Sequence, residues 1–199
     1  PGLMANIAGT RSDTPWASAR KNEWIWAFFV RAISGGWLGA LRIEWKRLRQ
    51  AGTSPWNPLE NRFLKWQIVQ WGLLIAVVMI LGWQVALAWG IAAGIGGCVL
   101  ESTNYIEHYG LTRERVREIR YSHVMPVHSW NSDHVMGRMV LFELTRHSDH
   151  HHWSDKPYQV LEHWPNAPQL PTGYPGMMLL SFFPPLFFSV MNRRTPQTE

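Results

Sequence analysis

The hydrophobic pattern of the chain is dominated by one long uncharged block. No Lys, Arg, Asp or Glu occurs from Trp66 to Leu100, a run of 35 residues. A soluble core helix seldom needs such a run, whereas one membrane-spanning helix needs about 20 apolar residues. The block is too long for one span, and residues 61–108 leave room for two helices with a tight break near Gly82–Trp83. The pattern therefore predicts a transmembrane helical hairpin.

An amphipathic pattern precedes this block. Apolar residues recur at three-, four- and five-residue steps between Trp24 and Trp45. The pattern predicts an interfacial helix over residues 16–50, kinked or interrupted at Gly35–Gly36. An acid or threonine before Pro15 predicts the N-cap of this helix. Its polar face carries Arg42, Lys46, Arg47 and Arg49.

Two segments of different character follow the block. Residues 111–165 are polar and rich in histidine, and within them Leu141 to His151 has a helical pattern. Residues 166–199 form an apolar tail broken by proline and glycine, which predicts an interfacial or re-entrant segment rather than a full span. The chain is thus expected to be a single domain, residues 1–199, of an all-α integral membrane protein.

Charge places the predicted spans. The net charge of +5 comes from ten basic residues before the apolar block and nine after it. Basic flanks mark cytoplasmic sides of a membrane, and two spans put both flanks on that side. The basic residues form no aromatic-interleaved patch, so we expect no nucleic-acid partner. The single cysteine, Cys98, excludes a disulfide or a CxxC metal site within the chain.

The strongest chemical signal is the spacing of His147, His150 and His151. Positions i, i+3 and i+4 share one face of a helix, so three imidazoles would converge there. Imidazole binds iron, zinc, copper and nickel, and the spacing alone therefore predicts a metal without identifying it. A solvated histidine-rich helix is the alternative, but it does not explain the shared face or the apolar residues that precede it. His152 falls off this face.

A second polar cluster occurs at the end of the predicted second span, in the segment Asn104 to Leu111. Ionisable residues there are costly and usually functional. His108 by itself is open between a buried, hydrogen-bonded histidine and a metal ligand. The other histidines, at 123, 128, 134 and 163, have no ligand spacing and are expected to lie at the surface or to be hydrogen-bonded. Acceptors for the second ring N–H of metal-bound histidines are expected among Glu101, Asn104, Glu107 and Asp149, with simple solvation as the alternative.

Four segments together resemble the alkane 1-monooxygenase family in order and spacing. They are PWASAR at 15–20, NYIEHYGL at 104–111, LTRHSDHH at 144–151 and LPTGYPGM at 170–177. The resemblance covers essentially the whole chain, and the second and third segments together are highly specific. Xylene-type monooxygenases share much of the pattern.

The resemblance implies a membrane-bound non-haem di-iron centre with about nine histidine ligands, of which this chain would supply His108, His147, His150 and His151. It implies O2-dependent hydroxylation of the terminal carbon of medium- or long-chain n-alkanes, which gives 1-alkanols. Electrons would come from NADH through a reductase and rubredoxin. The expected location is the bacterial inner membrane, a multi-pass protein in contact with lipid, with the active site toward the cytoplasm.

One departure from the family is large. Its first two histidine boxes, HxxxHK and HxxGHH, are absent, and no histidine precedes His108. Four histidines do not saturate two irons, so we expect a C-terminal fragment that is inactive alone. The alternatives are a xylene- or desaturase-like di-iron oxygenase, and a non-catalytic, metal-binding membrane protein made of this chain alone.

Overall fold

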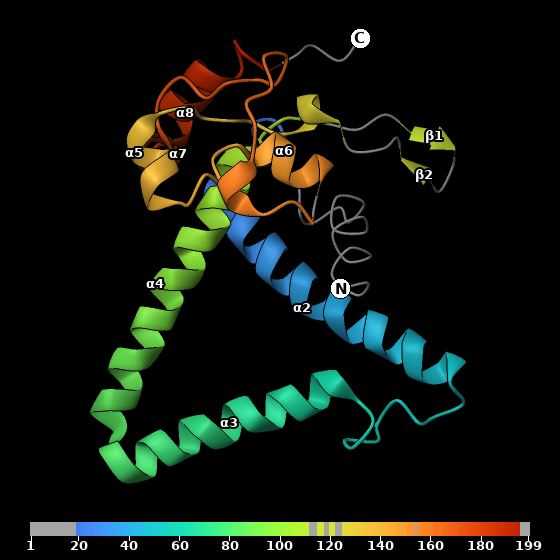
Figure 1. Cartoon of the computed structure of the whole chain (residues 1–199). Coiled ribbons are helices and arrows are strands. Elements are labelled where there is room, and N and C mark those ends of the chain that lie inside the picture. Colours follow the sequence, from blue (N-terminus) through green and yellow to red (C-terminus); the bar gives the residue numbers. More distant parts are fainter. Residues whose placement is uncertain (1–18, 112–114, 118–119, 122–124, 154, 196–199) are drawn as a thin grey trace. The chain divides into compact units, whose positions relative to one another are not determined.

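The fold is mainly helical, as the sequence predicts. The computed structural model describes residues 19–111, 115–117, 120–121, 125–153 and 155–195. Their contacts divide the chain into two units, one of residues 31–99 and one that joins the residues up to Val30 to those from Leu100 onward. The elements, in order, are α2 Ile25–Gln50, α3 Arg62–Leu81, α4 Trp83–His108, β1 Arg115–Arg117, β2 Arg120–Tyr121, η1 Pro126–His128, α5 Val135–Val140, α6 His147–His152, η2 Tyr158–Val160, α7 Tyr174–Ser181 and α8 Pro184–Met191 (Figure 1).

The expectation of an all-α fold needs one correction. Strands β1 and β2 pair in antiparallel fashion inside the histidine-rich segment. Such a two-stranded sheet lies within a chain whose other described elements are all helices. The apolar periodicity that indicates helices does not extend into this polar stretch, so the sequence offered no signal for these short strands.

Helices α3 and α4 are both long and apolar enough to cross a membrane, and they are the two such helices in the described part of the chain. They meet at Gly82, whose φ of 88° is open to glycine at little cost. Its backbone N–H donates to the carbonyl of Val78 at 3.0 Å and so closes the end of α3. The predicted break at Gly82–Trp83 is confirmed, while the hairpin and its sidedness stay predictions.

Helix α2 begins later than the sequence suggests. Its first residue is Ile25, because the chain before it turns at Asn22, which has a φ of 62°. The turn is closed by a hydrogen bond from the Glu23 N–H to the Arg20 carbonyl at 3.1 Å. The predicted cap at Pro15 lies outside the described residues. Gly35–Gly36 does not interrupt the helix, since a helical glycine costs only about 1 kcal/mol.

The unit of residues 31–99 has a well-capped start to α3. Asn61 accepts a hydrogen bond from the Leu64 N–H at 2.9 Å, and Glu44 accepts one from the Arg62 N–H at 2.7 Å. Both satisfy donors that a helix start leaves free. Arg47 donates to the same carboxylate at 2.7 Å, and this pairing, which leads the causes, lowers the pKa of Glu44.

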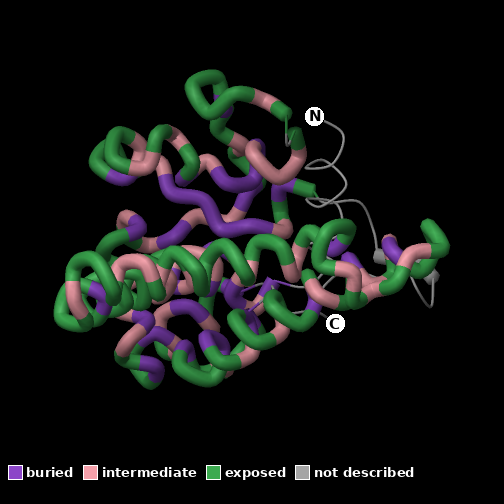
Figure 2. The backbone as a smooth tube through the Cα atoms, turned by 90° about the horizontal axis from the view of Figure 1, so that it is seen from below, coloured by how far each residue is buried: buried purple, intermediate pink, exposed green. Residues whose placement is uncertain are grey.

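The core of the other unit is aromatic. Tyr105 and Tyr109, one turn apart at the end of α4, place their rings 5.2 and 4.8 Å from that of Phe187 on α8. Both tyrosine rings are fully buried, as is Phe28 of α2. Figure 2 shows the alternation of buried and exposed stretches along the backbone. The tail predicted as interfacial forms α7 and α8, and Pro184 takes the first position of α8, where its missing N–H costs nothing.

Candidate metal centre

Three of the four predicted ligands come together. His108 lies at the end of α4, and His147 and His151 lie one turn apart on α6. The Nε2 atom of His147 is 3.3 Å from Nε2 of His108 and 2.8 Å from Nε2 of His151. Ligand atoms of the three rings all lie within 4.8 Å of one another. The structure therefore joins the end of the second apolar helix to the histidine-rich helix.

The separations of 3.3 and 2.8 Å from His147 Nε2 fit nitrogen ligands of one metal ion. Imidazole binds a first-row metal such as zinc at about 2.0–2.1 Å, so two nitrogens on one ion are about 2.9 Å apart at a right angle and about 3.4 Å apart at a tetrahedral angle. Burial first, and then the neighbouring histidines, lower the pKa of His147 well below its usual value. A neutral imidazole is the form that binds a metal. The three histidines are thus positioned to bind a metal ion.

His150 lies beside this cluster rather than in it. Its ring centroid is 6.0 Å from that of His147 and 5.8 Å from that of His151. Successive helical residues turn by roughly 100°, so positions 147 and 151 differ by only about 40° while 150 points about 60° to the other side. The expected convergence of all three imidazoles on one point is therefore not what the structure has.

The helix that carries these histidines is shorter than predicted. The sequence pattern suggests a helix from Leu141, but α6 begins at His147. Phe142 and Glu143 break it, because both have left-handed φ values of 52° and 62°. Glu143 turns back to pair with Arg138 on α5, at 2.7 and 2.9 Å. The ion pair forms with Glu143 in a left-handed conformation, which cannot occur inside a continuous right-handed helix.

Helix α6 is held by the segment before α5. Asn131 accepts a hydrogen bond from the Ser148 N–H at 2.8 Å and so caps the first turn of α6. The Ser148 hydroxyl donates to the carbonyls of Pro126 and Ser129 at 2.7 and 3.1 Å. Because the side chains of Ser148 and Asn131 are buried, these hydrogen bonds fix the position of α6.

The same segment also closes the end of α4. Trp130 donates from its backbone N–H to the Glu107 carbonyl at 2.8 Å and from its indole to the Tyr109 carbonyl at 2.9 Å. The backbone of His128 hydrogen-bonds to the His108 ring. Such a carbonyl fixes the tautomer and orientation of a metal-binding imidazole. Sequence reasoning gave this segment no role, because backbone acceptors have no residue signature.

Asp149 differs from its expected role. It is buried, and its carboxylate accepts from Lys156 Nζ at 2.8 Å, from the Glu162 N–H at 2.7 Å and from the Trp164 indole at 2.9 Å. Burial alone would raise the pKa of Asp149, but these three donors together lower it. The carboxylate therefore ties α6 to the loop after it, instead of accepting a hydrogen bond from a histidine ring.

The two acids on α4, Glu101 and Glu107, differ in burial and in hydrogen-bond partners. Glu101 accepts from the Asn104 amide at 3.3 Å, and this pair is only half-buried. Glu107 is buried, and its Oε2 atom lies 3.3 Å from Nε2 of His147. That nitrogen is the one that faces the other two histidines. Glu107 thus contacts the metal-facing side of His147, and not the second ring nitrogen as expected.

Tyr174 is a residue of this site that the sequence analysis missed. It begins α7, is fully buried, and its hydroxyl has no hydrogen-bond partner of good geometry. Burial, followed by the adjacent Glu107 carboxylate, raises the pKa of Tyr174 well above its usual value. The available signal was its place in the segment LPTGYPGM, which the resemblance included without assigning it a role.

Known proteins are similar in sequence to most of this chain. A family model described as fatty acid desaturase matches residues 5–181. Alkane 1-monooxygenase 1 of Alcanivorax borkumensis is 43% identical over 178 residues, which are 89% of this chain and 44% of that protein. Alkane 1-monooxygenase of Ectopseudomonas oleovorans is 40% identical over 176 residues, 88% of this chain and 44% of its own length. The hydroxylase component of a xylene/toluene monooxygenase from Pseudomonas putida is 30% identical over 188 residues, 90% of this chain and 46% of its own length. The chain therefore spans less than half the length of these relatives.

Proposed function

This chain belongs to the fatty acid desaturase family, and from that premise we propose that it forms part of an O2-dependent iron monooxygenase that hydroxylates the terminal carbon of n-alkanes. The observation that carries the proposal is the convergence of His108, His147 and His151 in a chain similar to alkane 1-monooxygenases. The product would be a 1-alkanol. Two irons are proposed, with further ligands from outside this chain.

Each histidine has a proposed task. His108, His147 and His151 hold one iron through their Nε2 atoms, and His150, beside them, contributes to the second. Iron, when bound, would supply the activation of O2, of which one atom would enter the C–H bond while the other would be reduced to water by two electrons and two protons. The carbonyl of His128 orients the His108 ring, and the network around Asp149 holds α6 in place. These contacts are made by this chain itself.

The location and the electron source follow from the same proposal. Apolar helices α3 and α4 would lie in the bacterial inner membrane, where n-alkanes dissolve, with the histidines toward the cytoplasm. Electrons would reach the site from rubredoxin and its NADH-dependent reductase. Similarity to the alkane 1-monooxygenases supports these assignments by family alone.

The test uses the whole coding frame that contains this chain. It is expressed in a bacterial membrane together with rubredoxin and its reductase, and 1-octanol formed from octane is measured. Because removal of even an outer contact of a metal site typically costs about 10–100-fold, His147→Ala and His150→Ala should each lower product at least about 100-fold. His163→Ala, in an exposed ion pair with Asp133, is the matched control. A purified protein without iron, or full activity in His147→Ala, would contradict the proposal.

An aromatic substrate is the second candidate. The similarity to the xylene/toluene monooxygenase component favours it, at the lower identity of 30%. The same cells are therefore given octane and xylene in parallel, and the alcohols are compared. A clear preference for octane supports the first proposal, and oxidation of the methyl group of xylene alone would replace it with this one.

A further inference from the structure

The buried acid at the histidine cluster lies beside no lysine or arginine in the part of the chain that the structure describes. This acid, Glu107, is 4% exposed. Its Oε2 atom lies 3.3 Å from Nε2 of His147, a neutral imidazole. An ionised carboxylate that is buried without a cation is strongly disfavoured. A cation bound beside Glu107 would remove this cost.

The cluster itself has the opposite need. His108, His147 and His151 are neutral when they bind a metal, so they bring no negative charge to a divalent cation. The other buried acid nearby, Asp149, already receives hydrogen bonds from Lys156, Trp164 and the backbone of Glu162. Glu107 is thus the buried carboxylate that remains to balance the ion.

Tyr174 sets the position of this carboxylate. It reaches the site from α7, far along the chain from Glu107, and it is 1% exposed. Its hydroxyl is buried without a well-aligned hydrogen-bond partner, and its interaction with the Glu107 carboxylate is favourable only while the phenol keeps its proton. A small rotation of either side chain would give a hydrogen bond from the phenol to the carboxylate.

We propose that Glu107 is the charge-compensating carboxylate of the metal centre, and that Tyr174 is the positioning residue that holds it on the metal-facing side of His147. The proposal rests on the proposed function insofar as the ion is taken to be iron. It adds to that function the carboxylate of Glu107, on the metal-facing side of His147, and the phenol of Tyr174, which comes from a third helix, α7.

The experiment compares Glu107→Gln with the unaltered protein, both expressed from the whole coding frame. Retention of Fe(II) against a chelator should weaken about 10–100-fold, as is typical when an outer contact of a metal site is removed. The metal-free protein should, in contrast, melt at the same temperature or higher, since without a cation an amide is no costlier to bury than an ionisable carboxyl group. These opposite effects separate charge compensation from a packing role, which would lower both.

Tyr174→Phe is the second variant. It should alter the Mössbauer spectrum of the bound iron and weaken retention less than Glu107→Gln, because the charge stays while its position relaxes. Glu44→Gln removes a buried carboxylate in the other unit, and Tyr105→Phe removes a phenol that donates to the Glu23 carbonyl instead. Both controls should leave iron retention and spectrum unchanged.

The failures are distinguishable. If the unaltered protein holds no iron, the proposed function fails and this inference with it. If the unaltered protein holds iron and Glu107→Gln retains it equally well with the same spectrum, the inference alone is overturned. A Glu107→Gln protein whose metal-free form also melts at a lower temperature would assign Glu107 to packing and overturn the inference as well.

Discussion

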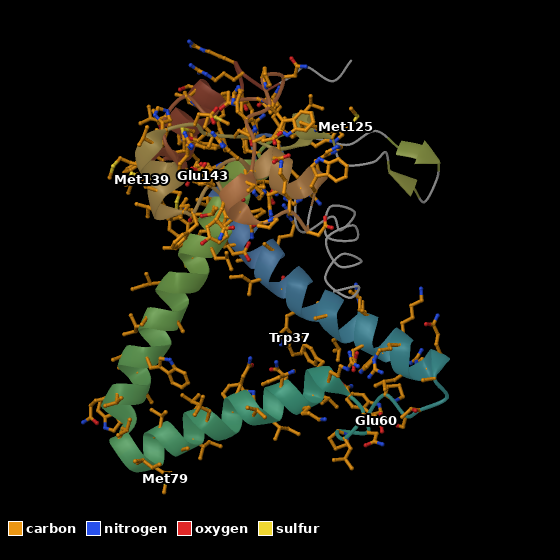
Figure 3. The ribbon with its side chains drawn as sticks, in the orientation of Figure 1. Trp37, Glu60, Met79, Met125, Met139 and Glu143 are labelled. Carbon is orange, nitrogen blue, oxygen red and sulfur yellow. The ribbon has the colours of Figure 1, made fainter. Side chains whose placement is uncertain are left out.

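Two regions of this molecule reverse the usual rule of burial in opposite ways. Around α6, polar groups are inside, and the side chains of Thr145, Ser148 and Asp149 are essentially hidden from solvent. Along α3, apolar groups are outside, and none of its residues is buried. Met79 points away from this helix and is 80% exposed (Figure 3).

The difference shows what each region's surroundings must supply. Around α6 the cost of burying Ser148 and Asp149 is offset by partners within the chain, since each has several. Along α3 the cost of exposing apolar groups disappears only if the medium is not water. One physical rule, desolvation, thus predicts a protein-filled environment for the first region and a lipid environment for the second.

The largest expected effect tests the first region. Trp130 is fully buried and bonds two carbonyls at the end of α4. Trp130→Ala should lower the free energy of unfolding by about 3–5 kcal/mol, as truncation of buried tryptophan does. Thermal unfolding in detergent measures it, with the exposed Trp153→Ala as control. A loss within about 0.5 kcal/mol of the control would show that this segment does not hold the site.

The next effect tests the second region. Ile75, in the middle of α3, is 61% exposed. If α3 spans a membrane, Ile75→Asp should disfavour insertion by about 3–4 kcal/mol, the difference between the two residues at the centre of a span. In water the same exposed substitution should matter by no more than about 0.5 kcal/mol. A glycosylation-based insertion assay measures the fraction inserted, with Ile75→Leu as reference, and equal insertion of both variants would refute the lipid environment.

The exposed apolar region was the easier one to predict from sequence. Absence of charge over a long run marks both helices, and Gly82 marks their break, because both signals are local. The pairing of His147 with His151 is local too, since one helical turn brings them together. Local patterns therefore account for the two long apolar helices and for two of the three clustered ligands.

The remainder of the site depends on contacts between distant residues. Tyr174 meets Glu107 only after α7 has folded, and no spacing rule joins them. The start of α6 was misjudged because the left-handed turn at Phe142 and Glu143 overrides an uninterrupted helical pattern. The role of Asp149 was misassigned because its three donors lie in the following loop, one of them a backbone N–H without residue signature.

Asp149→Asn gives a smaller effect within the first region. An amide offers one acceptor oxygen where the carboxylate offers two, and its NH2 group would face the donors of Lys156, Glu162 or Trp164. We expect a loss of about 1.5–3 kcal/mol in the free energy of unfolding, the range for a hydrogen bond to a charged group. Lys156→Met should cost less, because its ammonium is partly solvated. An equal loss in both variants would show that the ion pair alone matters.

The smallest effect lies where the apolar helix ends and the polar region begins. Gly110, just after α4, has a φ of 67°, and a Cβ there would lie 2.9 Å from Cγ2 of Thr195. Gly110→Ala should therefore cost about 1–2 kcal/mol for the left-handed backbone, plus the steric conflict. Thr195→Ser removes that methyl group but keeps the hydroxyl that donates to Met191. In a double-mutant cycle, the part of the loss that Thr195→Ser restores is the contact, and the part that remains is the backbone. If the serine variant restores all of it, the left-handed backbone at residue 110 adds no cost of its own.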